Sequence, residues 1–222
     1  MRLEYPYIQA GRYKRGRKHA PEFLVLHWSA GDGDDDAIAD YFVNPRKKIG
    51  VDDDGETIWG PRDASYHFAG GRWGSTVQMV DTDDTAWHSG GGTDWLGRKE
   101  VNDRSIGICL ANRGPIKAAR AKVLGPQRVY IGPHTKPGFH GYGKLFEGFP
   151  VEQRDALTHL IERIVKVHPT VKMVCGHEDL VKGKGDPGPA FNVWDPQWAR
   201  MGLTRRVKDW KSGRWAEWKP QG

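Results

Sequence analysis

The pattern of apolar positions predicts a series of short strands, because apolar and β-branched runs alternate with turns rich in glycine and proline. The expected strands cover residues 23–26, 65–68, 76–80, 105–110 and 171–175. The first run is continuously apolar and fits a buried strand. The second and third runs flank Gly70 and Gly71, a pair typical of a hairpin turn.

A helical period is clearest between Pro150 and Pro169. Its apolar positions are Leu157, Leu160, Ile161, Ile164 and Val165. These positions recur at the spacing of one helix face, with Pro150 suited to the helix start and Pro169 to its end. A last helix is expected from Asp195-Pro196, which resembles a cap followed by a first-turn proline.

Two acidic clusters need an interpretation. Residues 32–36 precede an apolar segment and are interpreted as a helix start, since carboxylates favour the positive end of the helix dipole. A calcium loop is the alternative, but the glycine that an EF-hand needs after its alternating aspartates is missing. Residues 52–55 are interpreted as a solvated turn, with an ion site as the less favoured alternative.

At 222 residues the chain is most simply a single domain, long enough to bury a substantial core. Three segments differ in composition from a core that covers residues 20–200. They are a basic N-terminal arm (1–19), a Gly/Pro-rich insertion (112–149) and a cationic, tryptophan-rich tail (203–222). The insertion is too long for an ordinary connection and is expected to be a functional lid or a mobile segment.

The tail combines cationic and indole side chains. They are Arg205, Arg206, Lys208, Trp210, Lys211, Arg214, Trp215, Trp218 and Lys219. One interpretation is that the tryptophans pack on the core while the charges are solvated. The other is an anchor to an anionic envelope or membrane surface, since Trp prefers the interface and each nearby Lys or Arg contributes about 1 kcal/mol.

The composition of the chain limits the classes of binding partner that we expect for it. Lys and Arg number 34 against 28 Asp and Glu, a formal net charge of +6 that favours nucleic acid, anionic lipid or cell wall as partner. The sequence shows no nucleic-acid-binding motif, so nucleic acid is not expected. It also lacks an apolar run near the roughly 20 residues of a membrane span and the apolar stretch of a secretion signal. We therefore expect a soluble, monomeric chain without a signal peptide, in which Cys109 and Cys175 are buried free thiols.

Two candidate metal ligands follow the strand expected over residues 171–175. His177 comes shortly after this strand, at the start of a glycine-rich loop that contains Asp186. A neutral imidazole and a carboxylate are both good zinc ligands, and Lys184 places a positive charge beside them. Alone, the pair is more simply a hydrogen-bonded turn, so a third ligand is needed. His27 is the best candidate, because it ends the strand of residues 23–26 and α/β proteins place their sites at carboxyl ends of strands. A buried core histidine is its alternative interpretation.

Six motifs in order carry a resemblance to a known family: LVLHWSA, SYHF, VQMV, AWHSGG, NDRSIGI and GHEDLVKGKGDPGPAF. Over residues 20–200 the chain resembles the zinc-dependent N-acetylmuramoyl-L-alanine amidases of type 2. This family includes phage lysozyme-amidases, cell-wall recycling amidases and animal peptidoglycan recognition proteins. The resemblance implies a single-domain α/β fold, with a mixed central β-sheet flanked by α-helices and zinc in a groove on one face.

The resemblance also implies roles for individual residues. His27, His177 and Asp186 become the zinc ligands, while Tyr66 and Lys184 become the catalytic residues. Tyr66 would orient the attacking water or pass a proton, and Lys184 would stabilise the reacting carbonyl. The recycling enzymes carry a glutamate on the strand that corresponds to residues 108–110, where this chain has no acidic residue. That difference favours the tyrosine-type arrangement.

Three further side chains belong to the same motifs. Trp87 and His88 are expected to bind substrate by shaping the groove for sugar or peptide. His67 follows Tyr66 in its expected strand and therefore faces the other way, so a structural role is expected for it.

Two neutral imidazoles and one carboxylate would leave zinc with a net charge of about +1 and an open position for water, whose pKa falls toward ~7. The implied reaction is cleavage of the amide between N-acetylmuramic acid and the L-alanine of the stem peptide. A phage endolysin, held in the host cytoplasm until its release to the wall, is the favoured setting. A cytosolic muropeptide-recycling amidase and a non-catalytic peptidoglycan-binding module are the alternatives.

Overall fold

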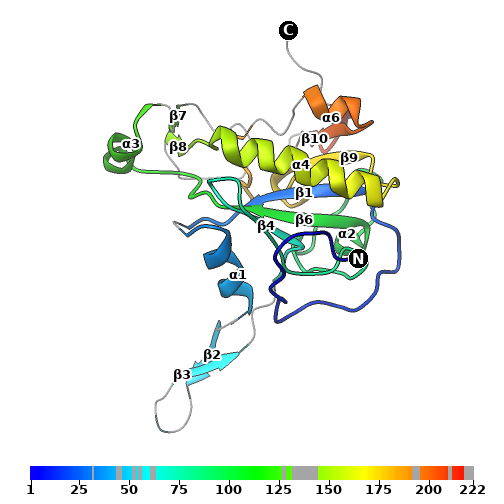
Figure 1. The fold of residues 1–222 in the computed structure, drawn as a ribbon, viewed down its shortest axis with the longest axis horizontal. Helices are drawn as coiled ribbons and strands as arrows, with labels where there is room; N and C mark the ends of the chain where they lie inside the picture. The colour runs from blue at the N-terminus through cyan, green and yellow to red at the C-terminus, as the bar shows by residue number, and fades with distance from the viewer. Residues whose placement is uncertain are drawn as a thin grey trace.

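A computed structural model gives the architecture of the chain (Figure 1). It describes residues 1–31, 33–43, 47–51, 54, 57–60, 64–126, 129–131, 145–191, 196–209 and 212–217. At its centre lies a seven-stranded sheet with the strand order β11-β10-β9-β1-β6-β4-β5. The strands are β1 (Phe23–Trp28), β4 (Phe68–Gly70), β5 (Thr76–Gln78), β6 (Ser105–Leu110), β9 (Met173–Gly176), β10 (Thr204–Lys208) and β11 (Trp215–Glu217).

The centre of this sheet is parallel and the two edges are antiparallel. β1 pairs in parallel with both β6 and β9, whereas β5 and β11 pair antiparallel with β4 and β10. All of β6 and β9 is buried, as expected where both faces of a parallel sheet are covered. Because β1, β6 and β9 run the same way, their carboxyl ends meet at one edge, the usual place for a site in an α/β fold.

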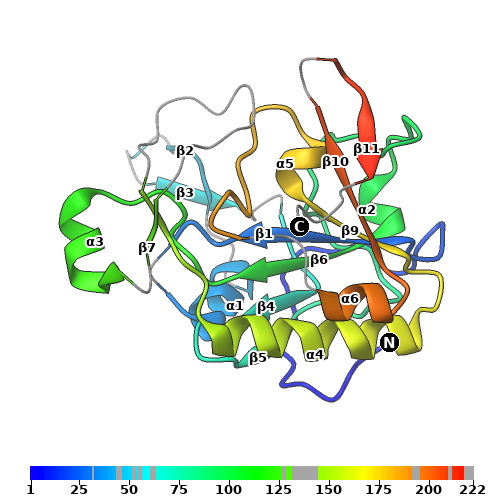
Figure 2. The same ribbon diagram turned by 90° about the horizontal axis from the view of Figure 1, so that it is seen from above.

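One face of the sheet is covered by α4 (Val151–Val167), with α6 (Pro196–Arg200) beside it (Figure 2). The apolar side of α4 joins Leu24, Leu26, Ile106 and Ile108 in the largest core cluster. Side chains alternate along a strand, so the residues between these positions in β1 and β6 face away from α4. His27 belongs to that second set.

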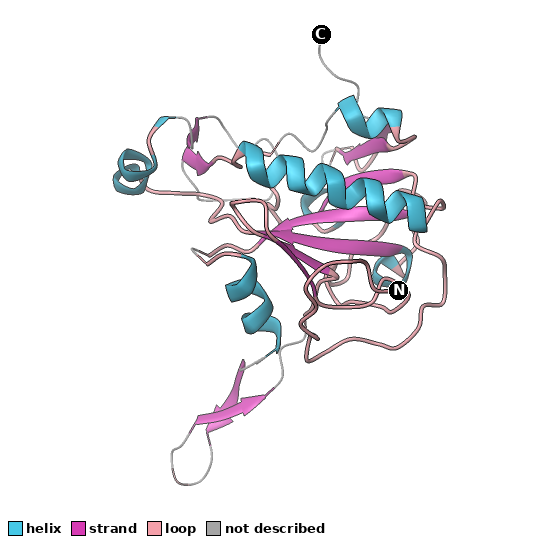
Figure 3. Ribbon diagram, in the orientation of Figure 1, coloured by secondary structure: helices cyan, strands magenta, loops and turns pink. Residues whose placement is uncertain are grey.

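The opposite face carries shorter helices (Figure 3). α1 (Asp35–Val43) packs Ile38 and Phe42 against Ala69 and Cys109. Two single-turn helices also contact the sheet, α2 (Val101–Arg104) before β6 and α5 (His177–Leu180) after β9. None of the helices in the described part of the chain has the length and apolar character needed to cross a bilayer.

Several sequence predictions are confirmed and one is wrong in part. The strand expected over residues 105–110 coincides with β6, and α4 starts directly after Pro150. Residues 65–67, expected to be strand, lie outside β4, because Ser65 and His67 donate their amides singly to Trp87 and Gly107. Of residues 52–55 only Asp54 is described, in an exposed turn.

The insertion contains regular structure where it is described. It holds α3 (Ala118–Leu124) and an antiparallel pair of β7 (Val129–Ile131) and β8 (Leu145–Glu147). A second hairpin, β2 (Lys47–Val51) with β3 (Thr57–Gly60), extends away from the sheet at the lower end of Figure 1. Residues 127–128 and 132–144 lie outside the described residues, so the expectation of a lid or mobile segment stays a prediction.

Both terminal segments pack on the core. In the arm, Ile8 and Ala10 donate backbone bonds of 3.0 and 2.9 Å to Gln78 and Met79, next to the edge strand β5. In the tail, β10 pairs with β9, Leu203 is buried, and Trp215 packs against the cluster that contains Leu180. For the described part of the tail, this favours packing over an anchor; residues 210–211 and 218–222 lie outside the described part.

Truncation after Gly202 should therefore destabilise the fold. It removes β10, β11 and Leu203, which is 2% exposed, and burial of that leucine alone contributes about 2 kcal/mol. We expect the melting temperature to fall by at least about 5 °C, with loss of activity on soluble as well as polymeric substrate. Truncation after Glu217 keeps both strands and is the control. An unchanged melting temperature, with weaker and less salt-sensitive envelope binding, would support the anchor instead.

Candidate metal centre and active site

The structure brings His27, His177 and Asp186 together at the carboxyl edge of the sheet. The Nδ1 atom of His27 lies 2.9 Å from Asp186 Oδ2, and Nδ1 of His177 lies 3.1 Å from both carboxylate oxygens. One ligand atom from each residue falls within 4.8 Å of the other two. All three side chains are buried. A cation at the centre would thus meet two imidazole nitrogens and one carboxylate.

Local backbone structure explains this convergence. β1 and β9 are neighbours, so His27 at the end of one strand lies beside His177, which directly follows the other. The loop after α5 folds back because Glu178 donates its amide to the Asp186 carbonyl at 2.9 Å. Gly176 permits this close return, since a Cβ there would stand 2.8 Å from Pro187 Cδ.

The electrostatics suit a metal. Burial and the adjacent His177 lower the pKa of His27 to about 4, against the attraction of Asp186. Burial alone would raise the pKa of Asp186, but the two histidines hold it well below the usual range. At neutral pH His27 is neutral and Asp186 ionised, the states required for coordination. Within the described part of the chain, the ion-pair partners of this buried carboxylate are the two histidines. A divalent cation such as zinc fits this donor set.

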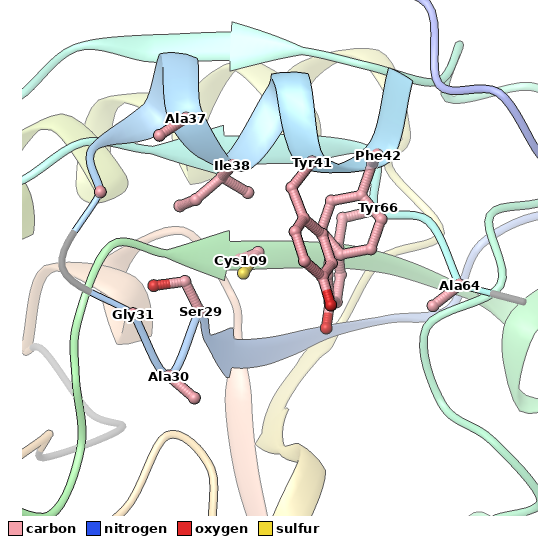
Figure 4. A pocket seen from close by; sticks show the side chains of 11 residues that line it. Ser29, Ala30, Gly31, Ala37, Ile38, Tyr41, Phe42, Ala64, Tyr66 and Cys109 are labelled. Atoms are coloured by element: carbon pink, nitrogen blue, oxygen red, sulfur yellow. The ribbon is translucent and has the colours of Figure 1, made fainter. Parts of the chain in front are cut away.

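Tyr66 lies against the metal centre. Its ring centroid is 4.8 Å from that of His27. Burial, followed by the nearby Cys109 and Asp186, raises its pKa well above the usual range, so the phenol is protonated at neutral pH. Tyr66 also lines a cavity of about 730 Å³ between α1 and the sheet (Figure 4). The other lining residues are Ser29, Ala30, Gly31, Gly33, Ala37, Ile38, Tyr41, Phe42, Ala64 and Cys109.

The other predicted site residues lie outside this cavity lining. Lys184 is exposed on the loop that leads to Asp186. Trp87 is half-buried and exchanges bonds with Ser65 through its backbone. His88 is only 4% exposed, and its ring nitrogens face His27 and Ser105, each at 3.2 Å. The ring of His88 thus contacts His27 directly, and the substrate-binding roles of Trp87 and His88 stay predictions.

His67 is buried, and its Nδ1 accepts a 3.0 Å bond from the Gly107 amide. The structural role expected for it agrees with this contact. Asn102, Ser105 and Cys109 were not among the predicted site residues, although the first two bond to His88 and Cys109 lies near Tyr66. The polar residues of the NDRS segment directly before a buried strand were the available signal for the first two.

A family model described as N-acetylmuramoyl-L-alanine amidase, Amidase_2, matches residues 17–189. The chain belongs to this amidase family. The predicted family membership is thereby confirmed. Among curated proteins, AmiD of Escherichia coli strain K12 is 32% identical over 144 residues, which make up 62% of this chain and 43% of AmiD. The chain thus spans less than half the length of that relative.

Solved amidase structures share the fold of this amidase. A selenomethionine derivative of AmpD aligns with a TM-score of 0.58 and 22% identity, covering 90% of this chain and 94% of AmpD. Escherichia coli AmiD aligns with a TM-score of 0.54 and 24% identity, covering 86% of this chain and 61% of AmiD. AmpDh3 from Pseudomonas aeruginosa aligns with a TM-score of 0.52 and 21% identity, covering 91% of this chain and 66% of AmpDh3. The mixed α/β architecture expected from the sequence is confirmed.

Proposed function

We propose that the chain is a zinc-dependent hydrolase that cleaves the amide bond between N-acetylmuramic acid and the L-alanine of the stem peptide. The observation that carries this proposal is the buried His27–His177–Asp186 donor set on an amidase-family fold. Two relatives support the substrate class. AmiD was solved with the substrate anhydro-N-acetylmuramic acid-L-Ala-D-gamma-Glu-L-Lys, and AmpDh3 was solved with an anhydromuramic pentapeptide.

The two Nδ1 atoms and the Asp186 carboxylate would hold the zinc. Three protein ligands leave a coordination position open, as is usual in catalytic zinc sites. A zinc ion in such a site supplies Lewis-acid activation of water and of the amide carbonyl. Because all three ligands are buried, bulk water competes little with their interactions.

Tyr66 and Lys184 are the residues we assign to the reaction itself. Tyr66 packs on His27 and lines the adjacent cavity, so its hydroxyl can donate a hydrogen bond to substrate bound there. Lys184 precedes Asp186 on an exposed loop, and its long side chain can reach the negative charge that develops on the carbonyl oxygen. Both residues thereby act on substrate without holding the metal.

Tyr66→Phe and Lys184→Ala should keep zinc but lower the rate of amide cleavage. Loss of one electrostatic partner commonly costs about 10²–10³ in rate. Tyr13→Phe, which alters another tyrosine packed on the same apolar cluster as Tyr66, and Lys182→Ala, in the same exposed loop, are matched controls that should cleave at the wild-type rate. Metal content and the release of new L-alanine amino termini are the measurements. Zinc loss in Tyr66→Phe would identify a structural support, and unchanged rates would remove either residue from the mechanism.

Digestion of purified sacculi tests the proposed function directly. The amidase should release new free L-alanine amino termini without new reducing sugar ends, and chelation should stop it until zinc is added back. Release of reducing ends alone would identify a glycosidase. A folded, zinc-loaded protein that binds sacculi but cleaves nothing would be a recognition module.

For the biological setting we propose a phage endolysin, consistent with the net charge of +6, which suits an anionic wall. A muropeptide-recycling amidase is the second candidate, favoured by the likeness in fold to AmpD and AmiD. Rates on intact sacculi and on a purified 1,6-anhydromuropeptide separate the two. Preference for the polymer supports the endolysin, and cleavage confined to the small anhydro substrate supports recycling.

A further inference from the structure

Both candidate metal-binding imidazoles are held from behind by consecutive residues of one segment. Each ring turns Nδ1 toward Asp186, so each Nε2 faces away from the centre. The Nε2 atom of His27 lies 3.2 Å from Nδ1 of His88, and that of His177 lies 3.4 Å from the backbone oxygen of Ser89. Residues 88 and 89 therefore contact both rings at the atoms that do not face the metal.

The partners determine where the protons lie. A backbone oxygen only accepts hydrogen bonds, so His177 must carry its proton on Nε2 to bond Ser89. The Ser105 hydroxyl lies 2.5 Å from the Val101 carbonyl and must donate to it. Ser105 Oγ, at 3.2 Å from His88 Nε2, can then only accept the His88 proton.

It follows that His88 Nδ1 carries a lone pair and accepts a proton from Nε2 of His27. The series of bonds runs from His27 through His88 and Ser105 to Val101, with every donor matched to an acceptor. With a cation bound, both metal-facing Nδ1 atoms are then unprotonated, whereas without one each Nδ1 can donate to the ionised Asp186 carboxylate. The lone pairs of two imidazoles and one carboxylate converge, an arrangement that a bound cation satisfies.

A single side chain fixes the segment that holds the two rings. Asn102 Oδ1 accepts the backbone amides of His88 and Ser89 at 3.1 and 2.9 Å. Gly107 of β6 gives the His88 ring its place against the sheet, since a Cβ there would stand 2.4 Å from His88 Cγ. His88 and Ser89 are 4% and 2% exposed, so solvent does not replace these bonds.

We propose that Asn102 and His88 are positioning residues of the metal centre. Asn102 holds residues 88 and 89, which in turn fix His27 and His177 as Nε2–H tautomers with Nδ1 presented to the metal. The proposal rests on the zinc centre of the proposed function. Outer partners of this kind commonly change metal affinity by about 10–100-fold.

The tautomers of the zinc-loaded wild-type protein provide the first test. Imidazole ¹⁵N chemical shifts, measured by NMR, distinguish protonated from unprotonated nitrogen in each ring. We expect Nε2–H for His27, His177 and His88. An Nδ1–H signal for His27 or His177 would overturn the proposal without any variant.

Zinc affinity of variants, measured by competition with a chelator, provides the second test. His88→Ala and Asn102→Ala should weaken zinc binding by about 10–100-fold, and only Asn102→Ala should disturb the tautomers of both metal-facing rings. His88→Asn places an amide oxygen near the former Nδ1 position and should restore part of the affinity. His168→Ala, which removes a buried histidine bonded to Thr82, is the matched control and should bind zinc as the wild type does.

Wild-type zinc affinity in folded His88→Ala and Asn102→Ala proteins would overturn the positioning role. If either alanine variant fails to fold, the zinc affinity of His88→Asn and the tautomers of the wild-type protein still test the positioning role. Neither readout requires catalysis. A protein with the expected tautomers and affinities that cleaves no peptidoglycan would refute the proposed function and leave this inference in place.

Discussion

Asp186→Ala should abolish zinc binding and amide cleavage together. The carboxylate is the only anionic member of the donor set and contacts both histidines, at 2.9 and 3.1 Å. Its removal leaves two neutral imidazoles, a set that holds zinc poorly compared with three protein ligands. We expect less than one tenth of the wild-type zinc content after gentle purification and no measurable release of L-alanine amino termini. Metal analysis and the sacculus digest measure the two effects.

Two substitutions make this result specific. Asp186→Cys should keep zinc, because thiolate is also a good zinc ligand. Asp179→Asn changes a fully buried carboxylate of α5 that accepts the Gly176 amide. The new amide can still accept that bond, so zinc content should be unchanged. If Asp186→Ala retained zinc and normal turnover, the third ligand would have been assigned to the wrong residue.

Glu147→Ala should cause a large loss of stability. Glu147 in β8 forms a bidentate pair with Arg72, at 3.0 and 3.2 Å, and both side chains are almost completely buried. Breaking a buried ion pair by removing one member costs about 3–5 kcal/mol. We expect the melting temperature to fall by about 10 °C and the urea midpoint to fall with it.

A double variant separates loss of the pair from loss of packing. Arg72→Met with Glu147→Leu removes both charges and keeps apolar volume, so it should be more stable than Glu147→Ala alone. Arg72 also donates to the carbonyls of Gly31 and Gly33, at 3.0 and 2.6 Å, so part of the loss will remain. A change in unfolding free energy below about 1 kcal/mol for Glu147→Ala would mean that the pair contributes little.

The sequence was sufficient where structure is determined locally. β6 and α4 follow from apolar period and flanking prolines, and both were located almost to the residue. The prediction of a strand over residues 65–68 was wrong for residues 65–67. Ser65 and His67 each donate one backbone bond to a different segment, so these residues form no continuous ladder with a neighbouring strand. The cations and tryptophans of the tail left packing and an anchor both open, because Lys and Arg favour anionic surfaces but are also common on edge strands, where they discourage aggregation.

For the candidate site, too, some residues could be identified from the sequence and others only from the fold. The family resemblance implied the three candidate ligands, and the structure brings them together although His27 and Asp186 are 159 residues apart. The supporting bonds of Asn102 and His88 depend on which strand ends meet in space, and no local pattern encodes that. His88 was therefore expected at the substrate groove, while its neighbours in the structure are His27 and Ser105.

The distance between the ligands along the chain also bears on when the protein becomes active. A ribosome releases β1 with His27 long before it makes the loop that carries Asp186, 159 residues later. Because parallel strands far apart in sequence pair late in folding, β9 can join β1 only when almost the whole chain has been synthesised. A translation product that ends before β9 therefore lacks two of the three candidate ligands, His177 and Asp186. In this way the distance between these segments along the chain delays assembly of the candidate metal site until β9 and the loop after it have been made.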